Sequence, residues 1–123
     1  MEGKPSYNIS TRINGEILEI VSAGEVPHDS VETFTEKVQD IVKSSNINKM
    51  LSDVRELKMP RVCAQAYSRI KKYPFFFCST TAVVDNPKNA DFQLFQEAAA
   101  SIFGIKMKYF TDVDSARDWL KNR

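Results

Sequence analysis

YPFFFCSTTAVVD, residues 73–85, is the stretch of sequence that decides the fold. Between Pro74 and the turn at Asp85, Asn86 and Pro87, almost every residue is aromatic, β-branched or small. Such a run predicts one strand that is buried on both faces. A strand of this kind needs a neighbour on each edge and cover on each face, so the flanking amphipathic segments are expected to pack around it.

A hairpin is expected at the N-terminal end. Residues 6–13 alternate between apolar and polar side chains, and residues 16–22 follow directly after Asn14-Gly15. Asn and Gly tolerate the positive φ that a type I′ turn requires, so the pair predicts an antiparallel connection. Residues 47–54 read as a third strand, whose carboxyl end is expected to carry polar residues.

Apolar residues recur at helical spacing in four further segments. Helices are expected from residue 29 or 30 to 43, from 60 to 72, from about 89 to 103, and from 113 to 122 after an Asp112 cap. The side chains expected to face the core are Cys63, Ala66, Tyr67 and Ile70 in the second helix, and Phe92, Phe95, Ala99 and Ile102 in the third. Residues 105–111 alternate as a lysine-bearing edge strand.

The resulting order is ββαβαβαβα within one domain that spans residues 1–123. It predicts an α/β fold with a five-stranded, mostly parallel sheet, an N-terminal antiparallel hairpin, four helices and right-handed crossovers.

Composition restricts the function. Seventeen Lys and Arg against sixteen Asp and Glu leave a net charge of +1, which lacks the footprint of a nucleic-acid binder. Cys63 and Cys78 do not have the spacing of a zinc site, and no motif implies a metal or cofactor. No apolar run approaches the roughly 20 residues of a membrane span. These features favour a reduced, cytoplasmic protein without an integral membrane segment.

Several stretches together resemble a known family. They are the Asn14-Gly15 hairpin, NKMLSDV leading to a helix at Pro60, TTAVVD, and above all the closing YFTDVDSARDWL, with Asp53 as a further match. In these features the chain resembles the SpoIIAA-like small bacterial domains, which are related to STAS and CRAL-TRIO domains. The resemblance implies a β-α superhelical domain that acts by binding, since some members antagonise anti-sigma factors and relatives carry lipids.

The chain departs from that family at one functional position. Phosphorylation-switched members carry an Asp-Ser followed closely by Gly where the helix after the third strand begins. Here the region reads DVRELKMPRVCAQAY, and no serine occurs between Asp53 and Ser68. Ser52 precedes that position and belongs to the strand, so the phospho-acceptor role is not carried over to it.

Polar residues at the carboxyl ends of the predicted strands form the first candidate site. Ligands of open α/β sheets bind at this edge, and an arginine near a helix N-terminus suits an anion. The residues are Asp53, Arg55, Arg61, Asp85 and Asn86. The alternative is that the aspartates cap turns while the arginines pair with them at the surface and contribute little.

An apolar pocket is the second candidate site, formed by Phe75, Phe77, Phe92 and Phe95. If the strands follow sequential order, the crossovers place the helices on one face and leave the other to be covered by a second copy, a partner or an apolar ligand. If the helices divide between both faces, the rings fill the core instead.

No set of residues forms a recognisable catalytic group. His28 precedes the first helix without an evident partner, and Cys63 is expected to pack in the second helix. We therefore expect a non-enzymatic, STAS-like binding or regulatory module that acts through a protein partner, with a homodimer as an open possibility. A carrier of a small apolar or lipid ligand is the alternative.

Overall fold

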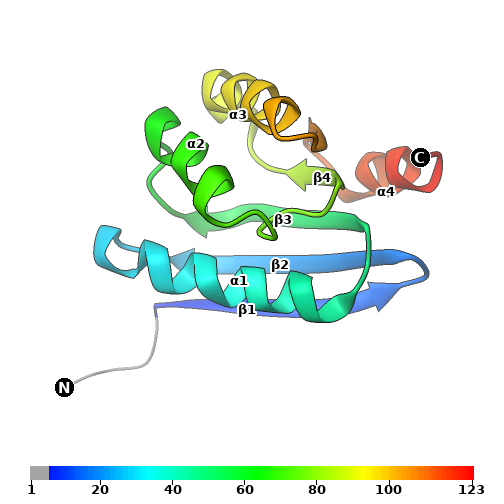
Figure 1. Cartoon of the computed structure of the whole chain (residues 1–123), viewed down its shortest axis with the longest axis horizontal. Helices are drawn as coiled ribbons and strands as arrows, with labels where there is room; N and C mark the ends of the chain where they lie inside the picture. Colours follow the sequence, from blue (N-terminus) through cyan, green and yellow to red (C-terminus); the bar gives the residue numbers. More distant parts are fainter. Residues whose placement is uncertain (1–5) are drawn as a thin grey trace.

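A computed structural model describes residues 6–123 as a sheet with helices on both faces (Figure 1). The elements are β1 (Tyr7–Asn14), β2 (Ile17–Glu25), α1 (Val31–Ser45), β3 (Lys49–Lys58), α2 (Cys63–Lys72), β4 (Thr80–Val84), α3 (Ala90–Ile102), β5 (Lys106–Phe110) and α4 (Val113–Lys121). Short 3₁₀ turns, His28–Ser30 and Pro87–Asn89, precede α1 and α3. The predicted order ββαβαβαβα is confirmed.

The strands lie in the sheet in the order in which they occur in the chain, β1-β2-β3-β4-β5. β1 and β2 are antiparallel, and the other neighbouring pairs are parallel. Gly15 has a φ of 63° in the turn between β1 and β2, so the Asn14-Gly15 hairpin forms as predicted. β5 is an edge strand, and its lysines Lys106 and Lys108 are exposed, as expected of a guarded edge.

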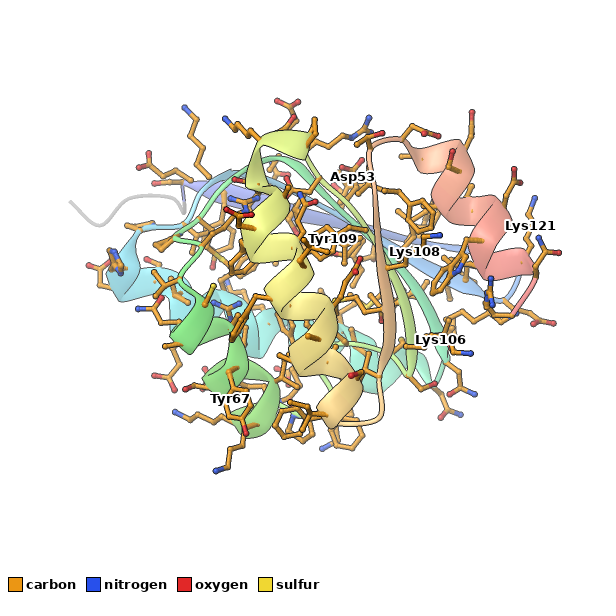
Figure 2. All side chains as sticks on the ribbon, turned by 90° about the horizontal axis from the view of Figure 1, so that it is seen from above. Asp53, Tyr67, Lys106, Lys108, Tyr109 and Lys121 are labelled. Carbon is orange, nitrogen blue, oxygen red and sulfur yellow. The ribbon has the colours of Figure 1, made fainter. Side chains whose placement is uncertain are left out.

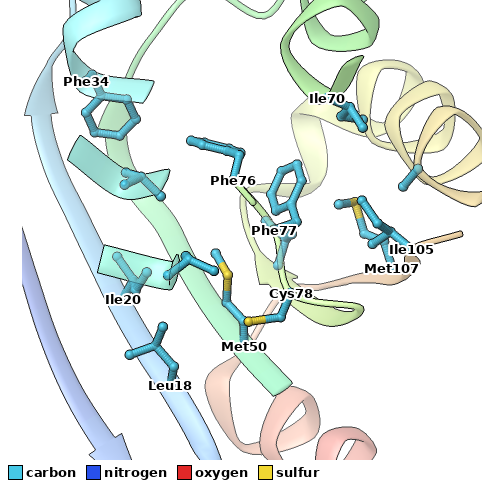
Figure 3. Packing of buried hydrophobic residues seen from close by; sticks show 14 of the residues in the cluster. Leu18, Ile20, Phe34, Met50, Ile70, Phe76, Phe77, Cys78, Ile105 and Met107 are labelled. Atoms are coloured by element: carbon cyan, nitrogen blue, oxygen red, sulfur yellow. The ribbon is translucent and has the colours of Figure 1, made fainter. Parts of the chain in front are cut away.

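The stretch from Tyr73 to Asp85 is not one strand, so that prediction was wrong in extent. Only Thr80–Val84 forms β4, and a turn closed by the Phe76 N–H on the Tyr73 carbonyl (3.0 Å) precedes it. Phe76 and Phe77 are buried nonetheless, because the turn directs both rings into the core (Figure 3). An apolar run buries its side chains equally well from a turn, and composition does not separate the two conformations.

Two cores flank the sheet, so the helices divide between its faces (Figure 2). Leu18, Ile20, Met50 and Val83 face the larger core on the side of α1, α2 and α3. On the opposite side, α4 contributes Ala116 and Leu120 to a smaller core, which also contains Ile17, Leu51, Ala82 and Val84. The sequential strand order therefore does not leave a whole face open, because α4 follows the edge strand and folds back onto the other side.

β3 is longer than predicted and runs to Lys58 instead of ending near Val54. Its register with β2 shifts between Val21 and Ala23, where Val21 lies opposite Asp53 but Ala23 lies opposite Glu56. This is a β-bulge, in which extra residues are taken up without ending the pairing. Arg55 consequently lies within the strand and not after it, and Asp53 lies in the middle of the strand and not at its end.

α2 and α3 are rotated relative to the prediction. The buried residues of α2 are Ala66, Arg69 and Ile70, and those of α3 are Gln96, Ala99 and Ala100. The expected core residues Cys63, Tyr67, Phe95 and Ile102 are exposed instead. Ala66, Ile70 and Ala99 are buried as predicted, and Arg69 and Gln96 join them at positions where the apolar pattern placed no core residue.

Candidate functional site

An internal cavity of about 60 Å³, partly open to the surface, lies between the sheet and α1, α2 and α3. Most of its wall is apolar, but five long polar or charged side chains also reach it. The lining residues are Ile20, Ser22, Phe34, Val38, Ser52, Val54, Leu57, Met59, Arg61, Arg69, Phe76, Phe77, Val83, Asp85, Phe92, Gln96 and Tyr109. Concave, mostly apolar pockets with a small number of placed polar groups are typical of small-molecule sites.

Asp85 and Arg61 form the ion pair in the cavity wall. Asp85 directly follows β4, and its carboxylate accepts hydrogen bonds from the Arg61 Nη2 (3.2 Å), the Asn86 backbone N–H (2.7 Å) and the Asn89 amide (3.3 Å). Arg61 also donates to the carbonyl of Met59 (3.3 Å), which fixes the segment before α2. Because the Asp85 side chain is almost fully buried, the pair joins the end of β4 to the start of α2 away from solvent.

Asp53 and Arg55 pair with each other on the opposite face of the sheet. The Arg55 Nε and Nη2 donate to the two Asp53 carboxylate oxygens at 3.0 and 2.8 Å. Asp53 lies beside Val113 and Arg117 of α4, and not beside the cavity. Asp53 and Asp85, which were predicted to form one site, therefore lie on opposite faces of the sheet. Side chains at successive positions along a strand point to alternate faces, and this places the two carboxylates apart.

An open groove of about 640 Å³ runs along the carboxyl edge of β2, β3 and β4. Arg55, Arg61 and Asn86 meet there, and the Asn86 amide donates to the Arg55 carbonyl at 3.2 Å. His28 and Lys88 also line this groove. Arg61 borders the groove and the internal cavity at once, so it lies in the wall that separates them.

The four predicted phenylalanines also divide. Phe77 and Phe92 line the cavity, whereas Phe75 and Phe95 are exposed and take no part in its wall. Phe76, which was not among the predicted pocket residues, lines it together with Phe77, and their rings meet edge to face with centroids 4.6 Å apart.

Three residues that line the cavity were not predicted from the sequence to do so, namely Arg69, Gln96 and Tyr109. The Tyr109 hydroxyl donates to the Gln96 Oε1 at 2.6 Å. Arg69 lies three residues after Ala66 and directly before Ile70, so it belongs to the apolar side of α2 by spacing alone. This position could have identified Arg69 as a candidate site residue, because a charged side chain within an apolar stripe is rarely buried without a partner or a function.

Burial dominates the protonation equilibria here. Loss of hydration lowers the pKa of Arg69 and raises the pKa of Tyr109 well above its usual range. The Cys78 thiol, beside the aromatic turn, has its pKa raised by burial to about 11. Tyr109 and Cys78 are therefore neutral at physiological pH.

Residues 6–123 contain neither a metal-binding cluster nor a membrane-spanning helix. No group of three or more His, Cys, Asp or Glu side chains in this range is arranged to hold a metal ion. None of the helices there is long and apolar enough to cross a membrane.

The fold is shared with solved structures of low sequence identity. An anti-sigma factor antagonist from Mycobacterium paratuberculosis superposes with a TM-score of 0.66 at 10% identity, covering 94% of this chain and 95% of that one. An uncharacterised protein with a SpoIIAA-like fold from Shewanella loihica gives 0.61 at 17% identity, covering 98% of each chain. The anti-sigma factor antagonist SpoIIAA in its unphosphorylated form gives 0.56 at 17% identity, covering 94% of this chain and 98% of that one.

Sequence comparison gives the family directly. Among curated proteins, none matches the chain. The family model described as SpoIIAA-like matches residues 17–121, which take in every element from β2 to α4. The chain therefore belongs to the SpoIIAA-like family.

Proposed function

We propose that the chain is a non-enzymatic binding module that acts through a protein partner, and that the outer side of α3 is part of the contact surface. The observation that carries this proposal is an apolar stripe that points to solvent. It consists of Leu94, Phe95, Ala98 and Ile102, and is called the α3 stripe below. Leu94 and Ile102 are 66% and 69% exposed.

The apolar surface extends from α3 to α2. Phe103 lies just after the α3 stripe, and its ring centroid is 5.4 Å from that of Tyr67 on α2. Both rings are more than one-third exposed. Contiguous exposed apolar surface is uncommon on a monomeric protein and marks sites of association. Aromatic side chains at such a surface are frequent anchors of protein interfaces.

We propose that the groove at the carboxyl edge of β2, β3 and β4 forms a polar part of the same contact surface. Arg55 keeps 40% of its side chain exposed beside Asp53, and Asn86 is next to it. Asp85 is too buried to touch a partner and would act by positioning Arg61. The fold is shared with proteins described as anti-sigma factor antagonists, a description that names a protein target. This likeness supports a protein partner without identifying it.

Control by the family's phospho-acceptor serine is not part of the proposal. α2 begins at Cys63, and residues 54–67 contain neither serine nor threonine. We also propose that the protein is located in the cytoplasm, because Cys63 and Cys78 are both free thiols.

In-cell photo-crosslinking tests the contact. A photo-reactive residue at position 98, within the α3 stripe, is expected to give a product with another protein. The same residue at position 118, on the exposed side of α4, is the control. Combining the position-98 probe with Leu94→Glu and Ile102→Glu should remove the product. Equal crosslinking at both positions, a product made only of two copies of this chain, or a product that survives the double substitution would contradict the proposal.

A carrier of a small apolar ligand is the second candidate function, because Phe77 and Phe92 line a mostly apolar, partly open cavity. Native mass spectrometry of freshly purified protein is expected to show a mass excess that disappears on denaturation. A clean protein mass in both states, with no binding of added apolar compounds, would remove this candidate.

A further inference from the structure

We propose that the internal cavity binds a short-chain monocarboxylate, whose carboxylate group pairs with Arg69 and whose apolar chain lies against the phenylalanines. This inference rests on the second candidate function and specifies the class of ligand. It does not depend on the partner surface of α3.

Arg69 is a buried cation without a counter-ion in the part of the chain that the structure describes. It is 8% exposed, and within residues 6–123 its guanidinium forms neither an ion pair nor a hydrogen bond. Every other arginine that lines the cavity or the neighbouring groove is paired, Arg61 with Asp85 and Arg55 with Asp53. A buried charge is normally compensated by a partner, so the free guanidinium indicates a missing anion.

The guanidinium lies on the cavity side of α2. Its Cζ is 5.9 Å from the centroid of the Phe76 ring. Its positive charge also acts on the pKa of Tyr109, in the direction that opposes the effect of burial. Phe76 and Tyr109 both line the cavity, whereas neither lines the shallow depression between α1 and α2 that Arg69 also borders. No fully enclosed polar side-chain atom in residues 6–123 lacks a hydrogen-bond partner. The unpaired Arg69 nitrogens therefore border open space, and Arg69 lines the cavity as well as the depression between α1 and α2.

Other donors converge on the same space. Gln96 is 4% exposed, and its Oε1 accepts the Tyr109 hydroxyl, which leaves its amide N–H groups without a partner among the described residues. Ser22 and Ser52, on neighbouring strands, also line the cavity, and each hydroxyl can donate a hydrogen bond there. Asp85 is the carboxylate of the cavity wall, and its oxygens are already occupied by three donors. An excess of donors over acceptors suits an anion.

The net charge of the residues that line the cavity predicts how many negative charges the ligand carries. Arg61 and Asp85 cancel, so Arg69 leaves the cavity wall with one uncompensated positive charge. A single carboxylate would neutralise it. The surrounding Phe34, Phe77 and Phe92 favour an apolar chain over a hydrophilic inorganic anion.

Volume sets the length of the ligand. The cavity of about 60 Å³ is smaller than the roughly 150 Å³ cavity that admits benzene. Because the cavity is partly open, a chain of a few carbons can extend to its opening, whereas a long fatty acid does not fit without rearrangement. Arg61, shared by the groove and the cavity, lies where such a ligand would enter.

The test measures binding to the full chain with matched probes. Butyrate, the neutral analogue butanol and inorganic phosphate are titrated separately and followed by two-dimensional NMR. Butyrate is expected to shift the amide signals around Arg69 and Gln96 and to bind about tenfold or more tightly than butanol. Arg69→Met should weaken butyrate by about tenfold or more and leave butanol within about twofold. Arg12→Met, an arginine on the far face, should change neither affinity.

A second measurement separates lost binding from lost folding. Because Arg69→Met removes an uncompensated buried charge, its melting temperature without ligand should equal or exceed that of the parent chain. Equal affinities for butyrate and butanol, an Arg69→Met variant that is folded and still binds butyrate fully, or binding of phosphate in place of butyrate would overturn the carboxylate site and leave an apolar carrier standing. If neither butyrate nor butanol binds and native mass spectrometry shows no mass excess, the carrier itself fails as well.

Discussion

Arg117 on α4 and Glu19 on β2 are 98 residues apart in the chain, yet two hydrogen bonds of 2.7 and 2.9 Å join their side chains. Glu19 also accepts from Arg12 and Asn14, each at 3.1 Å, and is 5% exposed. The Arg117 hydrogen bonds, together with those from Asn14 and Arg12, lower the pKa of Glu19 from 4.5 to about 2. This carboxylate therefore ties α4 to the N-terminal hairpin.

Glu19 should make stability depend on acid pH. A pKa that is lower in the folded state contributes stability that is complete above the unfolded value and is lost as pH falls from about 4.5 toward 2. The contribution is on the order of 2 to 3 kcal/mol. Urea unfolding should show Glu19→Gln less stable than the parent at pH 7, with the difference shrinking toward pH 2. Glu16→Gln, an exposed carboxylate near Lys49, is the control; a gap for Glu19→Gln that does not depend on pH would contradict the assignment.

Gly24 and Gly15 form a natural pair for testing backbone constraints. Both have positive φ, but a Cβ on Gly24 would lie 2.3 Å from the Ser6 carbonyl oxygen and 2.7 Å from the Tyr7 Cα, while one on Gly15 would meet nothing within 4 Å. Gly15→Ala should therefore cost roughly 1 kcal/mol from backbone strain alone. Gly24→Ala should cost roughly 3 kcal/mol because β1 must also move. Equal losses in denaturant unfolding would show that the close approach of β1 is unimportant.

The two cysteines should differ sharply in reactivity. Cys63 is exposed at the start of α2, whereas Cys78 is buried, donates to the Ile47 carbonyl and has its pKa raised to about 11. Since the thiolate is the reactive form, Ellman's reagent at pH 8 should label one thiol rapidly in the native protein and two in urea. Cys63→Ser should remove the rapid phase. Rapid labelling of both thiols without denaturant would mean that the aromatic turn opens readily.

Asp85 and Asp53 should differ in their effect on stability although each pairs with an arginine. Asp85→Ala would leave the largely buried Arg61 guanidinium unpaired in a cavity wall where Arg69 already has no counter-ion, which predicts a loss of about 3 to 5 kcal/mol. Asp53→Ala should cost about 1 kcal/mol or less, because Arg55 keeps enough exposure to be hydrated. Chemical denaturation of both variants checks the ranking. A loss for Asp53→Ala as large as that for Asp85→Ala would contradict it.

Elements defined by local chemistry could be predicted from the sequence. The Asn14-Gly15 turn depends on φ preferences of two residues, and the Asp112 cap on one side chain that accepts the Ser115 N–H at 2.8 Å. Strand and helix order followed from periodicity. The edge position of β5 was visible in Lys106 and Lys108.

Features that depend on tertiary packing could not be predicted. The turn at Phe76 and Phe77 has the composition of a strand, and only the finished core shows that the rings enter it from a turn. The rotation of α3, which exposes Leu94 and buries Gln96, depends on how α2 and β5 meet it. The burial of Arg69 could not be predicted for a related reason. Its spacing in α2 indicates burial, whereas its charge favours exposure to solvent. Only the folded structure, in which Arg69 lines the cavity, shows that it is buried.

The sequential strand order has a consequence for folding kinetics. Each strand pairs with the next in the chain, but only the β1–β2 hairpin closes a short loop, because each parallel pair must close over an intervening helix. The hairpin is therefore expected to form before the parallel pairings, which are slower to close. α4 is different, because Leu120 packs against Leu51 and Ile17 of strands formed much earlier in the chain. We expect α4 to dock after the rate-limiting step, so that Leu120→Ala accelerates unfolding while leaving the folding rate nearly unchanged, and Leu18→Ala slows folding. A chevron plot in which Leu120→Ala slows folding as much as Leu18→Ala would place α4 in the folding nucleus instead.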